Sequence, residues 1–551
     1  MTNSIHEIRD ADCIFITGSN TAESHPVISY EVVRAAHNGA NVIIIDPRKN
    51  PMCDHATLFL QIKPGTDIYV FLAIMHTIIE EGWADEAFIK ERTEGYEEFA
   101  AVLEEYTVER AALMSGVKAE LIVEAARIYA LGERAWGDSQ HGDARGRSSI
   151  LYAMGITQRS NGTDLVMTLA NMAMLCGQVG KPSTGVNPLR GQSNVQGACD
   201  VGCLVNVLPG YQQVTDGEKR QAIAKVWGKE ELPGEVGLTV VEAMKAASRG
   251  EVRAMYVMGE NPMLSDPNTS HVEGALRNLD FLLVQDIFPS ETAQLAHVIL
   301  PAASSLEKDG SFTNTERRVQ LLHPVLDPVG ESKPDWEIIG EIALRYEQKT
   351  GAAGDPAQWI YPSAEAIFDE ATRVTPIYGG MRYDRLQEQG LQWPCPDEDH
   401  PGTTYLHAEK FARGLGKFHP VEAIDPAELP DEEYPLILST GRMLFHYHTG
   451  TMTRRSEPLD WREQGRYVEI NEEDAAAAEL SEGDTVVVRS RRGAISAQAR
   501  IGQRVPPGTV FIPFHWRETP ANMLTQDHTL DPVAKIPEYK VCAVRLEPVR
   551  S

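Results

Sequence analysis

The first fifty residues alternate between strand and helix patterns, and this alternation constrains the fold more than any other feature. Residues 12–20, DCIFITGSN, form a short apolar run that ends in a glycine loop, and residues 41–49, NVIIIDPRK, contain a second such run. Residues 25–40, HPVISYEVVRAAHNGA, have the spacing of a helix between them. Strand, helix and strand in this order predict a parallel α/β sheet, whose ligands bind beyond the carboxyl ends of the strands.

The rest of the chain predicts a second α/β domain and a barrel. Strand patterns return at residues 149–158, 252–262, 281–293 and 297–320, and an apolar helix is expected at 163–180. After residue 434 the pattern changes to short strands, which is typical of a β-barrel. We therefore expect three domains: 1–192, 193–430 with an irregular connecting region from about 351 to 430, and 431–551.

Composition excludes several classes of partner. The 51 basic and 79 acidic residues give a net charge of -28, which makes nucleic acid and anionic membrane surfaces poor partners. No apolar run approaches the roughly 18 residues of a membrane span, and the N-terminus has no hydrophobic signal segment, so we expect a cytoplasmic protein with no membrane span. The seven cysteines are scattered and form no CxxC, so this chain predicts neither a disulfide framework nor an iron–sulfur or zinc site.

Polar loops follow the predicted strands of the first domain. They are GSNTAESH at 18–25, DPRK at 46–49 and IKPGTD at 62–67. Asp46 lies where an acidic residue commonly accepts a hydrogen bond from a ribose hydroxyl, although the GxGxxG motif is absent. The alternative, that Asp46 only caps the turn before Pro47, is equally compatible with the local sequence.

A second polar loop, NPLRGQSNVQGACDVG at 187–202, gathers hydrogen-bond donors around Arg190. Taken alone, it is either a solvated surface loop or a site for a small anion, and local sequence does not decide between them. A further motif, HYH at 446–448, offers two histidines, but without other ligands it is a weak indication of a metal site.

In this order and spacing, six motifs carry a resemblance to a known family: ILYAMGITQ, GVNPLRGQSNVQGACDVG, YVMGENP, DGSFTNTERRVQ, STGRMLFHYHTGTMTRRS and PEYKVCAVRLEP. Through them nearly the whole chain resembles the catalytic (alpha) subunits of molybdenum or tungsten formate dehydrogenases, in the dimethyl sulfoxide reductase (molybdopterin oxidoreductase) family. The resemblance implies an α/β fold with two pseudo-symmetric dinucleotide-binding-like αβα domains and a C-terminal β-barrel of the double-psi type. It also implies two-electron oxidation of formate to CO2, or the reverse, at molybdenum or tungsten held by bis-molybdopterin guanine dinucleotide (bis-MGD).

The resemblance assigns the substrate site to the second polar loop. Arg190 matches the arginine that orients formate in this family, and its guanidinium offers a bidentate fork to a planar carboxylate. Gln192 is expected to support the substrate or a pterin by hydrogen bonding. Nitrate reductases resemble this loop but lack the arginine, so Arg190 favours formate dehydrogenase over nitrate reductase. Ser193 replaces the usual first asparagine of the loop.

The resemblance also assigns residues to the two pterin dinucleotides. Those expected at the first are Gly18, Ser19, Asn20, Glu23, Ser24, Asp46, Pro47, Arg48, Gly65, Asp67, Met154, Gly155 and Gln158. Those expected at the second are Met258, Gly259, Glu260, Gln285, Asp286, Arg442, His446, Tyr447, His448, Thr449, Asn522, Tyr539 and Lys540. Backbone amides, acidic groups for guanine and basic groups for pyrophosphate suit such a ligand.

The sequence departs from the family pattern at its N-terminus. Family members begin with a 4Fe-4S domain, followed by the selenocysteine or cysteine that binds the metal and by a histidine, and none of these has a counterpart here. We therefore expect 4Fe-4S only in a missing N-terminal part and no protein ligand to the metal in this chain. One hypothesis is that Met1 is an internal methionine after a UGA selenocysteine codon.

Two alternatives remain for this departure. One is a split enzyme with a separate N-terminal fragment, and the other is a catalytically inactive scaffold subunit of an electron-transfer complex. For an active chain the implied partners are formate or CO2 and electron-transfer subunits that carry iron–sulfur clusters, flavin or both.

Overall fold

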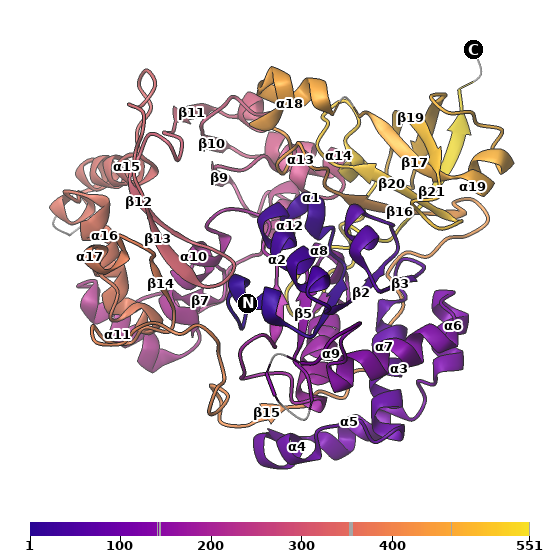
Figure 1. The fold of residues 1–551 in the computed structure, drawn as a ribbon. Helices are drawn as coiled ribbons and strands as arrows, with labels where there is room; N and C mark the ends of the chain where they lie inside the picture. The colour runs from indigo at the N-terminus through magenta and orange to yellow at the C-terminus, as the bar shows by residue number, and fades with distance from the viewer. Residues whose placement is uncertain (140, 143–144, 352–355, 464, 550–551) are drawn as a thin grey trace. The chain divides into compact units, whose positions relative to one another are not determined.

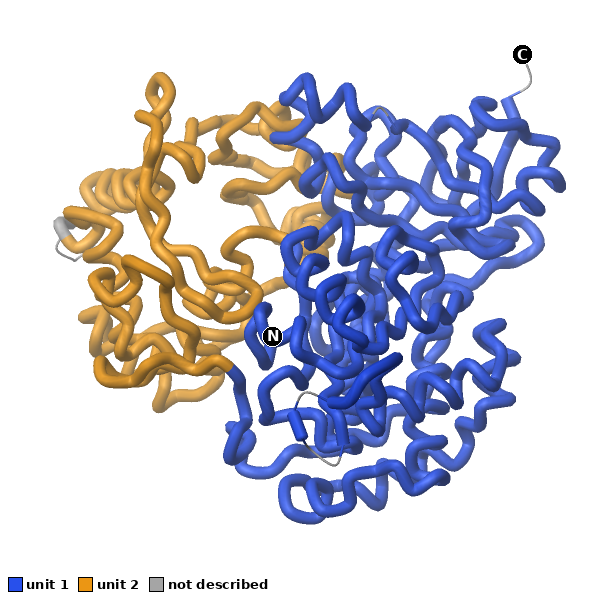
Figure 2. The backbone as a smooth tube through the Cα atoms, in the orientation of Figure 1, with its two compact units in different colours: residues 1–191, 264–270, 405–551 blue, residues 192–263, 271–404 orange. Residues whose placement is uncertain are grey.

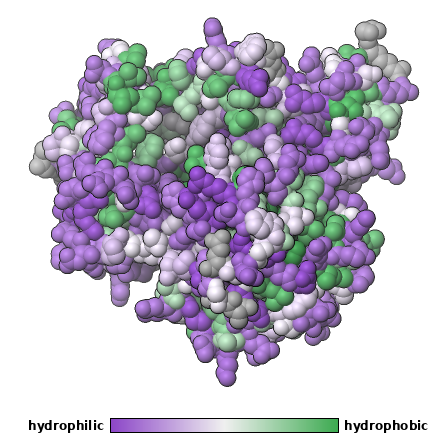
Figure 3. Space-filling model, viewed as in Figure 1, coloured by the Kyte–Doolittle hydropathy of each residue, from purple (hydrophilic) through white to green (hydrophobic). Residues whose placement is uncertain are grey.

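The computed structural model describes residues 1–139, 141–142, 145–351, 356–463 and 465–549 (Figure 1). The chain divides into two compact units (Figure 2). The first unit comprises residues 1–191, 264–270 and 405–551, and the second comprises 192–263 and 271–404. Hydrophilic side chains cover most of the face seen in Figure 3. None of the described helices is both long enough and apolar enough to cross a membrane.

A five-stranded parallel sheet forms the centre of the first unit. Its order is β3-β2-β1-β5-β6, with the strands at β1 Cys13–Thr17, β2 Asn41–Asp46, β3 Leu58–Gln61, β5 Ser148–Tyr152 and β6 Val186–Pro188. The chain builds the sheet outward from β1 in one direction and then from β5 in the other. The boundary between β1 and β5 is therefore a topological switch point, the place where sheets of this class bind ligands.

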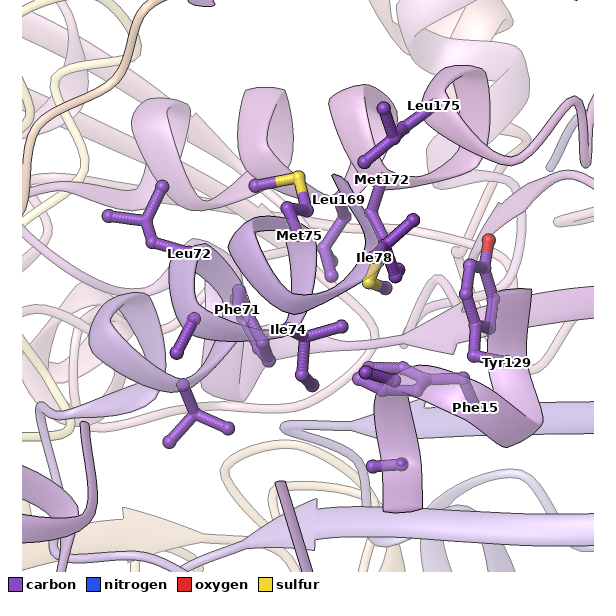
Figure 4. Close-up of a cluster of buried hydrophobic side chains, with 14 of the residues drawn as sticks. Phe15, Phe71, Leu72, Ile74, Met75, Ile78, Tyr129, Leu169, Met172 and Leu175 are labelled. Carbon is purple, nitrogen blue, oxygen red and sulfur yellow. The ribbon is translucent and has the colours of Figure 1, made fainter. Parts of the chain in front are cut away.

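Helices cover both faces of this sheet. Ile14 and Ile16 point to the face that packs against α2 (Pro26–His37), whereas Phe15 points to the face covered by α3 (Asp67–Glu80), α7 (Ala119–Leu131) and α9 (Gly162–Leu175). On that second face the Phe15 ring lies 5.6 Å from Tyr129, with Met172 in the same cluster (Figure 4). The alternation of side chains along a fully buried strand explains why these runs are apolar throughout.

The remaining helices of the first unit are α1 Thr21–Ser24, α4 Glu86–Arg92, α5 Tyr96–Leu103, α6 Val108–Ser115, α8 Met154–Thr157, α18 Glu457–Arg462 and α19 Glu472–Ala477. One of them differs from the sequence prediction. The pattern at 149–158 predicts a strand that runs into a glycine loop, but β5 ends at Tyr152 and residues 154–157 form one helical turn.

The C-terminal residues of the first unit form the predicted barrel. Its six strands close in the order β16-β20-β17-β19-β18-β21, with bounds β16 Leu436–Gly441, β17 Tyr467–Asn471, β18 Thr485–Arg489, β19 Ala494–Gly502, β20 Thr509–Pro513 and β21 Cys542–Pro548. Alternate side chains such as Val486 and Val488 fill the interior. The barrel contacts the loop after β2, where the Lys49 N–H donates to the Arg504 carbonyl oxygen at 2.7 Å.

The second unit contains a three-stranded parallel sheet with the order β11-β10-β9: β9 Ala254–Met258, β10 Phe281–Asp286 and β11 Val298–Pro301. One face packs against α12 (Val240–Ser248) and α14 (Thr269–Arg277). On the other face the side chains of Tyr256 and Phe281 are 42% and 44% exposed. This sheet is therefore smaller than the first and less covered.

The rest of the second unit includes an antiparallel sheet of β12 Gly310–Thr313, β13 Arg318–Leu322 and β14 Leu391–Gln392. Its helices are α10 Val195–Asp200, α11 Gly217–Val226, α15 Asp335–Thr350, α16 Ala364–Val374 and α17 Tyr383–Leu386. The region predicted to be irregular, 351–430, thus contains two helices, α16 and α17, although residues 352–355 lie outside the described part of the chain.

Candidate active site

Two glycine loops meet at the switch point of the first sheet. Gly18, with φ +55°, follows β1, and Gly155 follows β5; the Gly155 N–H donates to the Gly18 carbonyl oxygen at 3.0 Å. A Cβ on Gly155 would lie 2.6 Å from the Gly18 Cα, which is closer than real contacts allow. This backbone contact requires glycine in both loops. It brings the predicted residues Ser19 and Asn20 close to Met154 and Gly155.

The loop after β1 is ordered by its own side chains. The Asn20 side-chain oxygen accepts from the Glu23 N–H at 3.4 Å, its amide also contacts the Glu23 carboxylate, and the Ser19 hydroxyl lies 2.9 Å from the Thr21 hydroxyl. The neighbouring Thr17 hydroxyl is buried without a hydrogen-bond partner among the described residues. The structure therefore gathers Gly18, Ser19, Asn20 and Glu23 at one end of β1. Ser24 is the last residue of α1.

Asp46, at the end of β2, is held in a desolvated position. Its Oδ1 accepts from the Arg48 N–H at 2.9 Å, across Pro47. Burial raises the pKa of Asp46 from 3.8 to about 6, partly opposed by that hydrogen bond and by Lys540. Burial likewise lowers the pKa of Lys540 to about 8, although Asp46 and Glu538 oppose the shift. Two predicted cofactor residues, from β2 and from the segment before β21, thus share one electrostatic environment.

Asp46→Asn is expected to stabilise the cofactor-free chain at pH 7. The raised folded-state pKa means that ionised Asp46 destabilises the fold above pH 6, by up to about 3 kcal/mol for a pKa raised from 3.8 to about 6. Asparagine keeps the acceptor for the Arg48 N–H. As the pH falls from 6 towards 4, the Asp46 carboxylate takes up a proton in the folded state and this destabilisation is lost. The difference in Tm between Asp46→Asn and the parent should therefore vanish near pH 4.

Thermal unfolding at pH 7 and pH 4 measures this effect. Asp54→Asn is the matched control, because Asp54 is exposed on the segment after β2 and the substitution should leave Tm unchanged. A lower Tm for Asp46→Asn at pH 7 would mean that the carboxylate stabilises the fold, contrary to the desolvation argument.

A buried ion-pair network adjoins this position. Arg159 donates from Nη1 to the Asp67 carboxylate at 3.0 Å, and its Nε lies 3.2 Å from the Glu538 carboxylate. All three residues are buried. The neighbouring Tyr539 N–H donates to the Gln158 carbonyl oxygen at 3.2 Å. The network joins the start of α3, the turn after α8 and the segment before β21, and it therefore fixes the predicted residues Asp67, Gln158 and Tyr539.

Arg48 is predicted at the cofactor, and the structure places its side chain in an ion pair with the barrel. Its Nε and Nη2 donate to the two carboxylate oxygens of Glu469 at 2.7 and 2.8 Å, and its guanidinium carbon lies 4.2 Å from the centroid of the Phe511 ring. The side chains of Arg48 and Glu469 are only 8% and 3% exposed. The ion pair holds the loop after β2 against β17 of the barrel and so stabilises the position of this loop.

Arg190 lies just after β6, and its backbone is held by His25, which was not predicted as a site residue. The Nε2 of His25 lies 3.1 Å from the Arg190 carbonyl oxygen, which can only accept, so Nε2 carries the proton. Burial lowers the pKa of His25 to about 4, which keeps the ring neutral at pH 7. The other ring nitrogen, Nδ1, is buried without a partner among the described residues and offers a lone pair.

Basic side chains from the barrel lie beside this position. The Arg442 Nη1 lies 3.9 Å from where a Cβ of Gly191 would be, and its Nε is buried without a partner in the described chain. Burial lowers the pKa values of Arg442 and His448. His515, which was also not predicted, accepts from the Met443 N–H at 2.9 Å and fixes the turn that carries Arg442. The Arg442 guanidinium beside Gly191 suits an anionic ligand, whereas the Nδ1 lone pair of His25 suits a hydrogen-bond donor.

The other predicted residues of the first unit have structural contacts. The His446 Nδ1 lies 3.1 Å from the Thr453 hydroxyl, and the Thr449 hydroxyl lies 2.9 Å from the Thr451 hydroxyl. The guanidinium carbon of Arg442 lies 5.4 Å from the centroid of the Tyr447 ring. Asn522 and Tyr539 both donate to the carbonyl oxygen of Ser265, at 3.0 and 3.2 Å. Gly65 has φ +94°, and a Cβ there would lie 2.4 Å from Pro426.

The second unit carries the remaining predicted residues. The Gly259 N–H donates to the Gln285 carbonyl oxygen at 2.8 Å, so the ends of β9 and β10 are adjacent. The Gln285 amide donates to Asp335 at 2.7 Å, and Asp286 accepts from the Phe288 N–H at 3.1 Å. Met258 is half exposed, Glu260 lies in the same loop as Gly259, and Gln192 is exposed before α10. Assignment of these side chains to a second pterin stays a prediction.

The described residues contain no group of three or more histidine, cysteine, aspartate or glutamate side chains that could hold a metal ion. The histidines at 446 and 448 have different neighbours. His446 contacts the Thr453 hydroxyl, and the ring centroid of His448 lies 6.0 Å from that of Phe514.

Comparison with known proteins identifies the family. Residues 1–345 match the family model for molybdopterin oxidoreductase, and residues 436–543 match that for the molybdopterin dinucleotide binding domain. This chain belongs to the molybdopterin oxidoreductase family. Membership implies a molybdopterin cofactor, and the orphaned buried atoms at Thr17, His25 and Arg442 together with the glycine contact at the switch point fit a polar, anionic dinucleotide.

Several curated molybdopterin oxidoreductases are similar over the whole chain. The F420-dependent formate dehydrogenase subunit alpha of Methanocaldococcus jannaschii is 49% identical, over 99% of this chain and 78% of its own length. Formate dehydrogenase H of Escherichia coli is 40% identical, over 100% and 74%. The assimilatory nitrate reductase catalytic subunit of Bacillus subtilis is 37% identical, over 100% and 76%. Among solved structures, acetylene hydratase from Pelobacter acetylenicus has the same fold, with TM-score 0.71 at 18% identity, covering 100% of this chain and 81% of that one.

Proposed function

We propose that this chain is the catalytic subunit of a formate dehydrogenase, which oxidises formate to CO2 or catalyses the reverse reaction. The observation that carries the proposal is Arg190: it lies at the end of β6, at the carboxyl edge of the sheet, and its carbonyl oxygen is held by His25 at 3.1 Å. The relatives with 47–49% identity are alpha subunits of formate dehydrogenases, which supports the same activity.

Each side chain has a defined part in this proposal. The Arg190 guanidinium binds the formate carboxylate in a bidentate manner and stays charged at any working pH. Neutral His25 fixes the backbone that presents the guanidinium, and Arg442 adds positive charge beside Gly191. Gln192 donates a hydrogen bond to substrate or pterin. These residues contribute by positioning and by electrostatic stabilisation rather than by proton transfer.

The cofactor in this proposal is bis-MGD with molybdenum or tungsten, which supplies the two-electron redox centre when bound. One dinucleotide would contact the loops of the first sheet from Gly18 to Glu23 and at Asp46, Asp67 and Gly155. The residues proposed for the other dinucleotide are Gly259 and Asp286 in the second unit and, taken separately, the barrel loop from Arg442 to Thr449 in the first. The Arg442 donor and the His25 acceptor are buried and have no hydrogen-bond partner among the described residues, and they support this assignment because a bound ligand would satisfy both.

The proposal extends to partners and location. Formate oxidation releases two electrons, so the enzyme needs an electron-transfer subunit carrying iron–sulfur clusters, flavin or both. A 4Fe-4S cluster is proposed only for a part of the enzyme outside this sequence. A cytoplasmic location is likewise proposed.

Substrate specificity tests the proposal. Enzyme purified from its native source is expected to reduce a viologen dye with formate as the donor, and to show no oxidation of the reduced dye by nitrate. Formate-dependent reduction should require the metal and pterin found in the same sample. If nitrate oxidises the reduced dye and formate shows no activity, the protein is a nitrate reductase and the proposal fails. If the metal-loaded protein has neither activity, the inactive scaffold alternative is favoured.

A further inference from the structure

A buried carboxylate in the second unit accepts four hydrogen bonds. Asp200, the last residue of α10, is 0% exposed. Its Oδ1 accepts from the Gln196 amide at 2.8 Å and from the Tyr211 hydroxyl at 2.7 Å. Its Oδ2 accepts from the Tyr378 hydroxyl at 2.7 Å and from the Trp393 indole N–H at 2.8 Å. Every lone-pair direction of the carboxylate is thus used, as a buried charge requires.

The four donors come from separate parts of the sequence. Gln196 lies in α10 itself, Tyr211 follows β7 (Val207–Leu208), Tyr378 follows α16, and Trp393 follows β14. The carboxylate therefore holds α10 against three other segments of the unit. Burial alone raises the pKa of Asp200, and the hydrogen bonds from Tyr378, Tyr211, Gln196 and Trp393 oppose that shift.

The same network reaches the beginning of α10. The Tyr378 hydroxyl also contacts the Thr313 hydroxyl at 2.8 Å, and the Thr313 N–H donates to the Asn194 side-chain oxygen at 2.9 Å. Asn194 caps α10 with φ 62°, and a Cβ on Gly197 would lie only 2.2 Å from its Oδ1. Both ends of α10 are therefore fixed by one set of hydrogen bonds.

The start of α10 lies close along the chain to the residues predicted to bind formate. Asn194 lies two residues after Gln192 and four after Arg190. On the other side of this short segment the Arg190 carbonyl oxygen is held by His25 at 3.1 Å. Within the second unit, Gln192 and Ser193 therefore lead directly into α10, whose start is fixed through the Asp200 network.

We propose that Asp200 is a positioning residue for formate binding: by fixing α10 it sets the location of Gln192, two residues before Asn194. This inference rests on the proposed function. Asp200 does not contact the substrate in this scheme, and its effect passes through Asn194 and the loop. A shift of about 1 Å in groups that position a substrate can cost about 100-fold in kcat/KM, so the loss of a distant anchor is expected to weaken formate binding measurably.

Asp200→Asn is the informative variant. Asparagine keeps one acceptor oxygen and can satisfy one pair of donors, but its NH2 group then faces the other pair, donor against donor. Leu386→Ala is the matched control: Leu386 is 2% exposed in the hydrophobic cluster that contains Tyr378, and its loss lowers stability without removing a donor to Asp200. Tyr378→Phe is a milder second variant that removes one donor and keeps the ring packing.

The experiment compares steady-state formate kinetics, metal content and Tm for the three variants as holoenzymes. Asp200→Asn is expected to raise the KM for formate at least about 10-fold with kcat changed less than about threefold, and Tyr378→Phe to raise KM about threefold. Leu386→Ala should lower Tm with KM unchanged. An unchanged KM in Asp200→Asn, or an equal rise in Leu386→Ala, would overturn the proposal; if Asp200→Asn does not fold, Tyr378→Phe decides by the same criterion.

Hydrogen exchange of the peptide covering residues 188–200 separates this proposal from the proposed function. Faster exchange in Asp200→Asn than in Leu386→Ala is expected whatever the substrate is. If the parent enzyme is inactive with formate, the proposed function fails while exchange still decides whether Asp200 fixes the loop. Equal exchange in the two variants would reject the positioning role even in an enzyme that oxidises formate.

Discussion

Replacing Arg190 with lysine is expected to lower kcat/KM for formate by at least about 100-fold while metal and pterin content stay at the parent level. Lysine keeps the charge but loses the planar fork that binds both carboxylate oxygens, so the variant would hold formate through a single mobile ammonium. The His25 contact is to the backbone carbonyl of residue 190 and survives the substitution. Formate-dependent dye reduction, with metal and pterin measured on the same preparation, tests the result.

The control for Arg190→Lys is Arg34→Lys. Arg34 lies on α2 in the same unit, its side chain is 58% exposed, and its contact with Glu31 is 3.7 Å long. This substitution should leave formate kinetics within about twofold of the parent, because the Arg34 side chain is exposed and Glu31 keeps its closer contact with Arg9 at 2.7 Å. If Arg190→Lys behaved in the same way, formate would not be held by this guanidinium, and the assignment of the loop as the substrate site would fail.

The largest expected effect on stability comes from Glu469→Ala. The substitution leaves the Arg48 guanidinium buried without its bidentate partner, and also removes the acceptor of Arg504 at 3.1 Å. Removing one partner of a buried ion pair typically lowers the free energy of unfolding by about 3–5 kcal/mol. Because Arg48 follows β2 and Glu469 lies in β17, the loss should appear as a lower Tm together with weaker retention of cofactor.

Glu547→Ala is the matched control in the same barrel. Glu547 accepts hydrogen bonds from two arginines, Arg489 at 2.7 Å and Arg545 at 2.9 Å, but the three side chains are 33–39% exposed, so solvent screens these pairs. Its Tm should fall much less than that of Glu469→Ala. Equal Tm values for Glu469→Ala and Glu547→Ala would show that the buried Arg48–Glu469 pair stabilises the fold no more than an exposed pair does.

The sequence predicted most of the architecture because the architecture follows from local patterns. Continuous apolar runs at 13–16 and 42–45 are typical of buried parallel strands, and the change to short strands after 434 indicated the barrel. The local pattern was less informative at 154–157. Strand and helix share short apolar runs, and there the backbone contact between Gly18 and Gly155 starts a helical turn instead of a loop.

The site was predictable only where a motif carried it. Arg190, Asp46 and the loop from Gly18 to Glu23 were predicted from the motifs NPLRGQSNVQG, DPRK and GSNTAESH. The structure brings the strands that carry them to one edge of the first sheet. His25, Arg159 and Glu538 were missed although each directly adjoins a selected residue. Their roles depend on partners far along the chain: His25 contacts a residue 165 positions away, and Arg159 pairs with Glu538.

The same reason explains Arg48. Its sequence neighbourhood, DPRK, is compatible with a ligand contact, whereas its bidentate partner Glu469 lies 421 residues away. No local pattern indicates such a pair. Asp200 is similar, because its four donors converge from segments that only the folded chain brings together.

The most direct test of the account is the stoichiometry of cofactor on protein purified from its native source. Acid hydrolysis should release two molecules of GMP per chain, one from each pterin dinucleotide, together with one atom of molybdenum or tungsten. One GMP per chain would remove one of the two proposed dinucleotide sites. Protein that carries neither GMP nor metal, though fully folded, would contradict the claim that this chain is a formate dehydrogenase catalytic subunit.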